Sequence, residues 1–259
     1  MNPANRHSGL PVGGRARSMG RVRRRHSAGA EQDLVWLLDL DNTLHDAKPE
    51  IFPRINLAMT DYVARRLGMP HDEASALRVH YWQRYGATLL GMVHHHGIDA
   101  HEFLRETHPF PDLHRIVDRS HALREMLRRL PGRKIVLTNA PNAYARGVLR
   151  GLGIAAQLDG LIAIESMRFA GRFLPKPSRS MLAKLIARLR VPARCCVLVE
   201  DSPANLHAAR ACRLRTVVVT GLSLGAVHAT GRLRAGRGRR IDVQVQSPWT
   251  LPRIVHKIR

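Results

Sequence analysis

The stretch "VWLLDLDNTLHDA" (residues 35–47) joins an apolar run to two carboxylates that stand one residue apart. The apolar run is typical of a strand that is buried on both faces of a sheet. Asp39 and Asp41 follow at the carboxyl end of this strand, where their negative charges repel each other. The pattern therefore raises the question of what gives the two acids different roles.

Similar apolar runs recur along the chain, at residues 134–138, 195–199 and 215–219. Segments with helical spacing lie between them, and alternating strands and helices indicate a parallel sheet. Residues 241–258 are expected to add one more strand and a closing helix. The sequence thus predicts an α/β fold, a Rossmann-like parallel sheet core flanked by helices, over residues 34–46 and 129–259.

Residues 47–128 do not follow this alternation. They contain amphipathic segments such as "INLAMTDYVARRLG" (residues 55–68) and "EASALRVHYWQRYG" (residues 73–86), which Gly and Pro separate. This spacing predicts an all-helical cap domain, inserted directly after the first strand. Such a cap would lie over the sheet edge at which that strand ends.

Polar side chains stand at the ends of several predicted strands and in one loop. The carboxyl ends of parallel strands meet at one edge of a sheet, so these groups are expected to converge in a crevice there. They are Asp39, Asp41 and Thr43; Thr138 and Asn139; Lys176 and Ser178; and Glu200, Asp201, Ser202 and Asn205. Taken singly, each group has an ordinary role as a turn, a helix cap or a surface loop.

Four motifs in order, "DLDNTLH", "LTNA", "LPKP" and "VEDSPAN", resemble those of the haloacid dehalogenase superfamily of phosphotransferases. The resemblance spans about residues 34–221. Within the superfamily, the insert with "RYGATLLGM" (residues 84–92) and "HHHGIDAHEFLRETH" (residues 94–108) resembles the pyrimidine 5'-nucleotidase group.

The resemblance implies distinct roles for the two acids. Asp39 would attack phosphorus as the nucleophile, and Asp41 would first protonate the leaving oxygen and then deprotonate water. Mg²⁺ would be bound by Asp39, by the backbone carbonyl of Asp41 and by Asp201. Thr138, the backbone N–H of Asn139 and Lys176 would bind the phosphoryl group, and Lys176 would also balance the charge of Asp39.

Further residues are expected around this centre. Thr43, Glu200, Ser202 and Asn205 would support the metal-binding and phosphate-binding groups, and Glu200 is an alternative metal ligand. His45, Tyr85 and His108 are candidate substrate contacts. The alternatives are a turn role for His45 and packing of the helical core for Tyr85 and His108.

The predicted activity is Mg²⁺-dependent hydrolysis of a phosphomonoester, with UMP or CMP as the working substrate. A phosphatase for another small metabolite, or a phosphomutase on the same core, remains the alternative. Because the motifs contact only phosphate and metal, substrate selectivity is expected to reside in residues 45–128.

The formal net charge of +22 suggests a second class of function. Residues 1–25 carry seven arginines and residues 226–240 carry five, with no acid in either segment. Both segments, residues 1–33 and the Arg/Gly-rich loop 224–240, are expected to be flexible. An RNA-binding protein or scaffold is the non-enzyme alternative, although no aromatic residue stands in either basic run to stack on bases.

Cysteine content and hydropathy indicate the compartment. The chain has three cysteines, too few for a disulfide framework, and no apolar run of the roughly 20 residues that a membrane span needs. We therefore expect a cytoplasmic protein with a small phosphomonoester as its partner and no membrane association.

Overall fold

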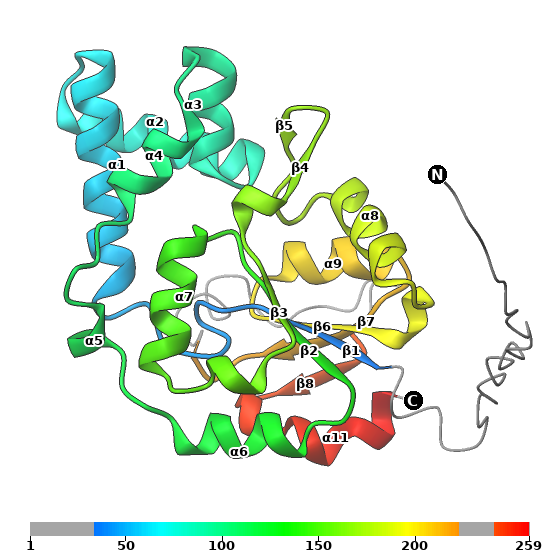
Figure 1. Cartoon of the computed structure of the whole chain (residues 1–259). Coiled ribbons are helices and arrows are strands. Elements are labelled where there is room, and N and C mark those ends of the chain that lie inside the picture. Colours follow the sequence, from blue (N-terminus) through cyan, green and yellow to red (C-terminus); the bar gives the residue numbers. More distant parts are fainter. Residues whose placement is uncertain (1–33, 223–240, 259) are drawn as a thin grey trace, which may run out of the picture.

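The computed structural model describes residues 34–222 and 241–258, and a parallel six-stranded sheet lies at its centre (Figure 1). The strands follow in the spatial order β3 (Gly160–Ile162), β2 (Arg133–Leu137), β1 (Val35–Leu38), β6 (Cys196–Glu200), β7 (Arg215–Val219) and β8 (Val243–Val245). The predicted α/β class is confirmed. The basic segments expected at 1–33 and 224–240 lie outside the described residues.

Helices cover both faces of the sheet. Because side chains alternate along a strand, Trp36 and Leu38 of β1 face one apolar layer and Val35 and Leu37 face the other. The first layer includes α6 (His121–Arg129), α7 (Asn142–Gly151) and α11 (Leu251–Ile258), and the second includes α8 (Arg179–Leu189) and α9 (Pro203–Ala211). Short 3₁₀ helices lie at η1 (Ala155–Gln157), η2 (Ile164–Ser166), η3 (Ala193–Cys195) and η4 (Pro248–Thr250).

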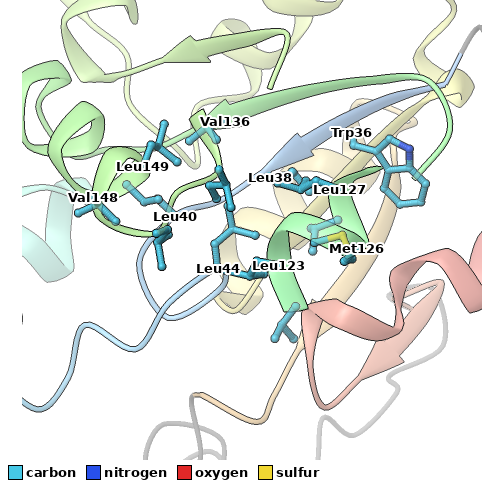
Figure 2. Close-up of a cluster of buried hydrophobic side chains, with 14 of the residues drawn as sticks. Trp36, Leu38, Leu40, Leu44, Leu123, Met126, Leu127, Val136, Val148 and Leu149 are labelled. Carbon is cyan, nitrogen blue, oxygen red and sulfur yellow. The ribbon is translucent and has the colours of Figure 1, made fainter. Parts of the chain in front are cut away.

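The loop after β1 is anchored in the first of these layers. Leu40 and Leu44 are 0% and 1% exposed, and Figure 2 shows them in one cluster with Val148 and Leu149 of α7 and with Leu123 of α6. These apolar anchors fix the backbone on either side of the acidic residues. The position of the acids is therefore determined by core packing.

A second helical unit stands above the sheet edge in Figure 1. It consists of α1 (Ile51–Leu67), α2 (His71–Tyr85), α3 (Thr88–His96) and α4 (Ala100–Thr107). Its helices share an apolar cluster in which the rings of Tyr62 and Phe103 meet edge to face, with their centroids 5.1 Å apart. Two residues from the sheet domain, Ile164 and Phe173, are buried in the same cluster.

The last helices of the stretch expected to form the cap pack elsewhere. Leu113 of α5 (Leu113–Ile116) and Leu123, Met126 and Leu127 of α6 belong to the cluster under the sheet. In contrast, Phe103 and Leu104 of α4 belong to the helical cluster above it. The apolar clusters therefore group α5 and α6 with the sheet, together with Ile51 and Ile55 at the start of α1, although these buried residues all lie within the expected cap range 47–128.

Both edges of the sheet are short strands. β3 and β8 have three residues each, and neither pairs on its outer side within the described ranges. A separate hairpin, β4 (Arg168–Phe169) and β5 (Arg172–Phe173), leads from η2 towards Lys176. None of the helices in the described ranges combines the length and the apolar character needed to cross a membrane.

Candidate active site

The loop that carries the two acids is a compact turn. The carbonyl of Leu40 accepts the N–H of Leu44 at 2.9 Å, and Asn42 has a positive φ of 59°. Asparagine tolerates this left-handed conformation better than most residues. The turn follows directly from β1, where the N–H of Asp39 donates to the carbonyl of Val199 at 3.0 Å.

A buried lysine joins two of the expected carboxylates. Lys176 Nζ lies 2.5 Å from Asp39 Oδ1 and 2.7 Å from Glu200 Oε2. The three residues are between 1% and 6% exposed, so water screens their charges little. The sheet topology thus assembles groups that are 137 and 24 residues apart in the chain.

Asn139 fixes the loop that presents this lysine. Its side-chain amide donates to the carbonyl of Lys176 and accepts the N–H of Lys176, both at 2.9 Å. The sequence suggested only a backbone role for Asn139, and its side-chain role was missed. A polar residue after a buried strand signals the site, but its partner 37 residues away is visible only in the fold.

The crowding of charges changes the protonation of these groups. Burial, together with the charge of Glu200, outweighs the attraction of Lys176 and raises the pKa of Asp39 to about 7. Burial alone would lower the pKa of Lys176, but the charges of Asp39 and Glu200 outweigh it and raise the pKa. Burial likewise raises the pKa of Glu200. The site therefore holds excess negative charge above neutral pH, which favours a bound cation.

Three carboxylates are close enough to share that cation. Each of Asp39, Glu200 and Asp201 offers an oxygen, and these oxygens lie within 4.8 Å of one another. Carboxylate oxygens are the ligands that Mg²⁺ prefers. Glu200 belongs to this group as fully as Asp201, although the sequence analysis assigns Glu200 mainly a supporting role.

Asp41 accepts two hydrogen bonds on one oxygen. His45 Nε2 lies 2.8 Å from Asp41 Oδ1, and the hydroxyl of Tyr144 donates to the same oxygen at 2.6 Å. His45 thus lies beside an acid in the turn, while Tyr144 was missed by the sequence analysis. Burial and the charge of Asp41 raise the pKa of Tyr144, so its hydroxyl remains protonated.

The remaining expected residues lie around these groups. Thr43 Oγ1 donates to Asp39 Oδ2 at 3.2 Å, and the N–H of Ser202 donates to Glu200 Oε1 at 3.2 Å. Thr138 is 2% exposed, and its hydroxyl accepts the N–H of Ala140. Asn205 lies half-buried in the first turn of α9.

The amino ends of two helices near the site have defined caps. Ser178 caps α8 by accepting the N–H of Met181, as its position in the sequence predicts. At α7, the N–H of Asn142 donates to both carboxylate oxygens of Glu165 at 3.0 Å. The positive end of the α7 dipole is thus already matched with a carboxylate.

The candidate substrate residues occupy different places. The Tyr85 hydroxyl lies 2.7 Å from His95 Nε2 in the helical unit. The next residue, Gly86, lies so close to Lys176 and Pro177 that an added Cβ would be 3.1 Å from Pro177 Cδ and 3.5 Å from the carbonyl oxygen of Lys176. His108 stands where the chain leaves α4, with its ring 5.9 Å from that of Tyr144. Burial lowers the pKa of His108 to about 4.

A cavity of about 640 Å³ has Tyr144 among the residues that line it. It lies between α7 and the segment that contains α5. Aromatic rings of Phe110 and Tyr144 line it together with the polar groups of His108, His114 and Arg150. The cavity thus offers stacking surfaces and hydrogen-bonding groups, and Tyr144 is the lining residue that also contacts Asp41.

Comparison with protein families identifies a hydrolase family. The model described as "haloacid dehalogenase-like hydrolase" matches residues 35–213. A curated relative, Phosphate metabolism protein 8 of Saccharomyces cerevisiae, is 26% identical over 189 residues, which cover 68% of this chain. The match spans 58% of that relative, so this chain corresponds to less than two thirds of its length.

Solved structures share the fold at low identity. L-2-haloacid dehalogenase from Xanthobacter autotrophicus is 16% identical, with a TM-score of 0.52 over 87% of this chain and 98% of its own. A haloacid dehalogenase-type phosphatase from Thermococcus onnurineus is 19% identical, with a TM-score of 0.52 over 86% and 97%. A putative beta-phosphoglucomutase from Thermotoga maritima is 16% identical, with a TM-score of 0.51 over 87% of this chain and 100% of its own. These proteins are named for different reactions, so the likeness establishes the fold.

Proposed function

Because this chain belongs to the haloacid dehalogenase-like hydrolases, we propose that it is an Mg²⁺-dependent phosphomonoester hydrolase that acts through an aspartyl-phosphate. The observation that supports this reaction is the buried contact of Asp39 with Lys176, beside the acidic group that Asp39 forms with Glu200 and Asp201. We further propose a pyrimidine nucleoside 5'-monophosphate, UMP or CMP, as the substrate.

The residues present fit a divalent cation. Three carboxylates offer oxygens within 4.8 Å of one another. Burial, together with the charge of Glu200, raises the pKa of Asp39 to about 7, so a bound cation would stabilise its charged form. Asp39, Asp201 and the backbone carbonyl of Asp41 would hold Mg²⁺, with Glu200 as a further oxygen ligand. When bound, the ion neutralises negative charge as carboxylate and phosphate approach each other.

Asp39 and Asp41 then have separate roles in the two steps of the reaction. A carboxylate oxygen of Asp39 attacks phosphorus, and the bond from phosphorus to the ester oxygen breaks. Asp41 gives its proton to that ester oxygen. In the second step Asp41 takes a proton from water, the water oxygen bonds to phosphorus, and the bond from Asp39 to phosphorus breaks.

Lys176 and its neighbours stabilise the negative charge that develops on the phosphoryl oxygens. Lys176 is held in place by Asn139, so little reorganisation is needed during the reaction. Thr138 and the N–H of Asn139 are proposed donors to the same oxygens. Phosphoryl transfer depends mainly on such positioning and charge stabilisation.

The cavity beside Tyr144 supports a nucleoside as the leaving group. A pyrimidine ring stacks well on aromatic side chains such as Phe110, and its oxygens accept hydrogen bonds from His114 or Arg150. His45, Tyr85 and His108 remain proposed substrate contacts. His45 lies beside Asp41, and the ring of His108 lies beside that of Tyr144. Tyr85 precedes Gly86, which lies close to Lys176. A cytoplasmic location remains a prediction.

The test is a panel of phosphomonoesters with and without Mg²⁺. We expect phosphate release from UMP and CMP to exceed that from sugar phosphates, to need Mg²⁺, and to vanish in Asp39→Asn. Equal rates on all esters would reject the nucleotidase assignment while leaving the phosphatase chemistry. Absence of any phosphate release, with tight and salt-dependent RNA binding, would favour the scaffold alternative.

A further inference from the structure

The acid Asp41 is held by a tyrosine that the family motifs do not contain. Tyr144 lies on α7, 103 residues from Asp41 in the chain, and its hydroxyl donates to Asp41 Oδ1 at 2.6 Å. His45 Nε2 lies 2.8 Å from the same oxygen. Within the described part of the chain, the hydrogen bonds to the Asp41 carboxylate all end on Oδ1.

We propose that Tyr144 is a positioning residue that, with His45, clamps Asp41 by Oδ1 and so presents Oδ2 as the oxygen that carries the proton. This inference rests on the proposed phosphatase function. Two donors that converge from different elements on one carboxylate oxygen fix the rotation of the carboxyl group. The second oxygen is then held in one direction instead of sampling several.

The tyrosine itself is held firmly. Tyr144 is 4% exposed, and its ring packs against Phe110, with centroids 5.3 Å apart, and against His108. Both neighbours belong to the segment that returns from α4 to the sheet domain. A ring fixed on two sides keeps its hydroxyl in place without help from substrate.

Ester chemistry can separate positioning from general structural damage. The alcohol released from UMP is a poor leaving group, so its departure needs a proton from Asp41. The nitrophenolate released from p-nitrophenyl phosphate is a stabilised anion, so its departure needs the proton much less. The ratio of kcat/KM for the two esters therefore reports how well Asp41 delivers its proton.

Tyr144→Phe removes only the hydroxyl and keeps the ring packing. We expect kcat/KM to fall about 10-fold or more on UMP and less than about 3-fold on p-nitrophenyl phosphate, as a fraction of the full general-acid effect. On p-nitrophenyl phosphate the variant should also show a burst of nitrophenolate, because Asp41 then deprotonates water poorly and the aspartyl-phosphate accumulates. His45→Leu, which removes the other contact, should show the same dependence on the ester.

Two controls make the result decisive. Tyr62→Phe removes a hydroxyl that contacts Glu102 in the helical unit, so it should leave the ratio between the two esters unchanged. Asp41→Asn removes the proton donor itself, so it should give the largest ratio of kcat/KM on p-nitrophenyl phosphate to kcat/KM on UMP. The ratios of the other variants are compared with it. Equal losses on both esters in Tyr144→Phe, or no loss, would overturn the inference while Asp41→Asn still upholds the proposed function. A wild-type protein that hydrolyses neither ester would overturn both.

Discussion

The sheet edge and the helical unit above it are built by different kinds of contact. At the edge, Asp39, Asn139, Lys176 and Glu200 come from segments far apart in the chain and meet through hydrogen bonds of 2.5 to 2.9 Å. In the helical unit, polar contacts join neighbouring helices, such as Tyr85 with His95, 10 residues apart, and Tyr62 with Glu102, 40 residues apart. The contacts of the Lys176 side chain at the edge are buried and join charged groups, whereas the contacts of Tyr62 and Tyr85 in the helical unit are partly or fully exposed. The difference teaches that, of the two regions, the edge is the one in which charges are held away from water.

The largest expected effect tests the chemistry of the edge. Asp39→Asn removes the proposed nucleophile, and we expect kcat to fall by about 10⁴-fold or more. Lys176 keeps its contact with Glu200 in this variant, so the protein should remain folded. Phosphate release from UMP and a thermal unfolding curve check both statements. A variant that retains a tenth of the activity would remove Asp39 from the reaction.

The next effect concerns stability at the same edge. Lys176→Met leaves the buried carboxylates of Asp39 and Glu200 facing each other without a cation, which should lower the free energy of unfolding by about 3–5 kcal/mol. Urea unfolding in EDTA measures it. Lys257→Met, at an exposed position on α11, is the matched control and should change little. A similar decrease in the free energy of unfolding for both variants would show that the contacts of Lys176 with Asp39 and Glu200 do not stabilise the fold.

The dependence of stability on pH tests His108, which lies where the chain leaves the helical unit after α4. The folded pKa of His108, lowered to about 4 from an ordinary value of 6.5, means that the unfolded chain takes up the proton first. The corresponding stability is present above pH 6.5 and is lost as the pH falls towards 4, at most about 3 kcal/mol. His108→Gln should flatten this part of the unfolding curve against pH. His121→Gln, at an exposed position, is the control and should leave the curve unchanged. An unchanged slope in His108→Gln would contradict the prediction.

The smallest effect tests where the helical unit meets the edge. Gly86 and Gly97 both have positive φ, 81° and 62°, so alanine at either position should cost about 1 kcal/mol of stability. A Cβ at Gly86 would also lie 3.1 Å from Pro177 Cδ, whereas a Cβ at Gly97 meets nothing within 4 Å. We therefore expect only Gly86→Ala to raise KM for UMP, by several-fold. Equal KM values would show that this contact does not matter to substrate binding.

The sequence predicts the fold where its signal is strong and local. The apolar runs that became β1, β2, β6 and β7 are long enough to identify, but β3 has three residues and the strands of the β4–β5 hairpin have two. Such short segments carry no periodic pattern. Residues 121–129 have the same amphipathic spacing as the helices above the sheet, so the pattern does not reveal which apolar cluster their helix joins.

The site divides in the same way. The order of the motifs leads to Asp39, Lys176 and Glu200 because parallel strands end at one edge. Tyr144 stands only two positions into an ordinary amphipathic helix, and nothing local links it to Asp41. The side-chain role of Asn139 was hidden for the same reason. Contacts between distant side chains depend on the exact register of helix and loop, which a single sequence does not show.

The brevity of the outer strands has a consequence for association. Among the residues that the structure describes, β3 and β8 leave at most three residues of unpaired backbone at either side of the sheet, too little to template a long intermolecular ladder. A continuous sheet formed between two copies of this chain is thus disfavoured at both margins. Self-association, where it occurs, is expected to use side-chain surfaces, and concentrated samples are expected to resist amyloid-like growth from the native state.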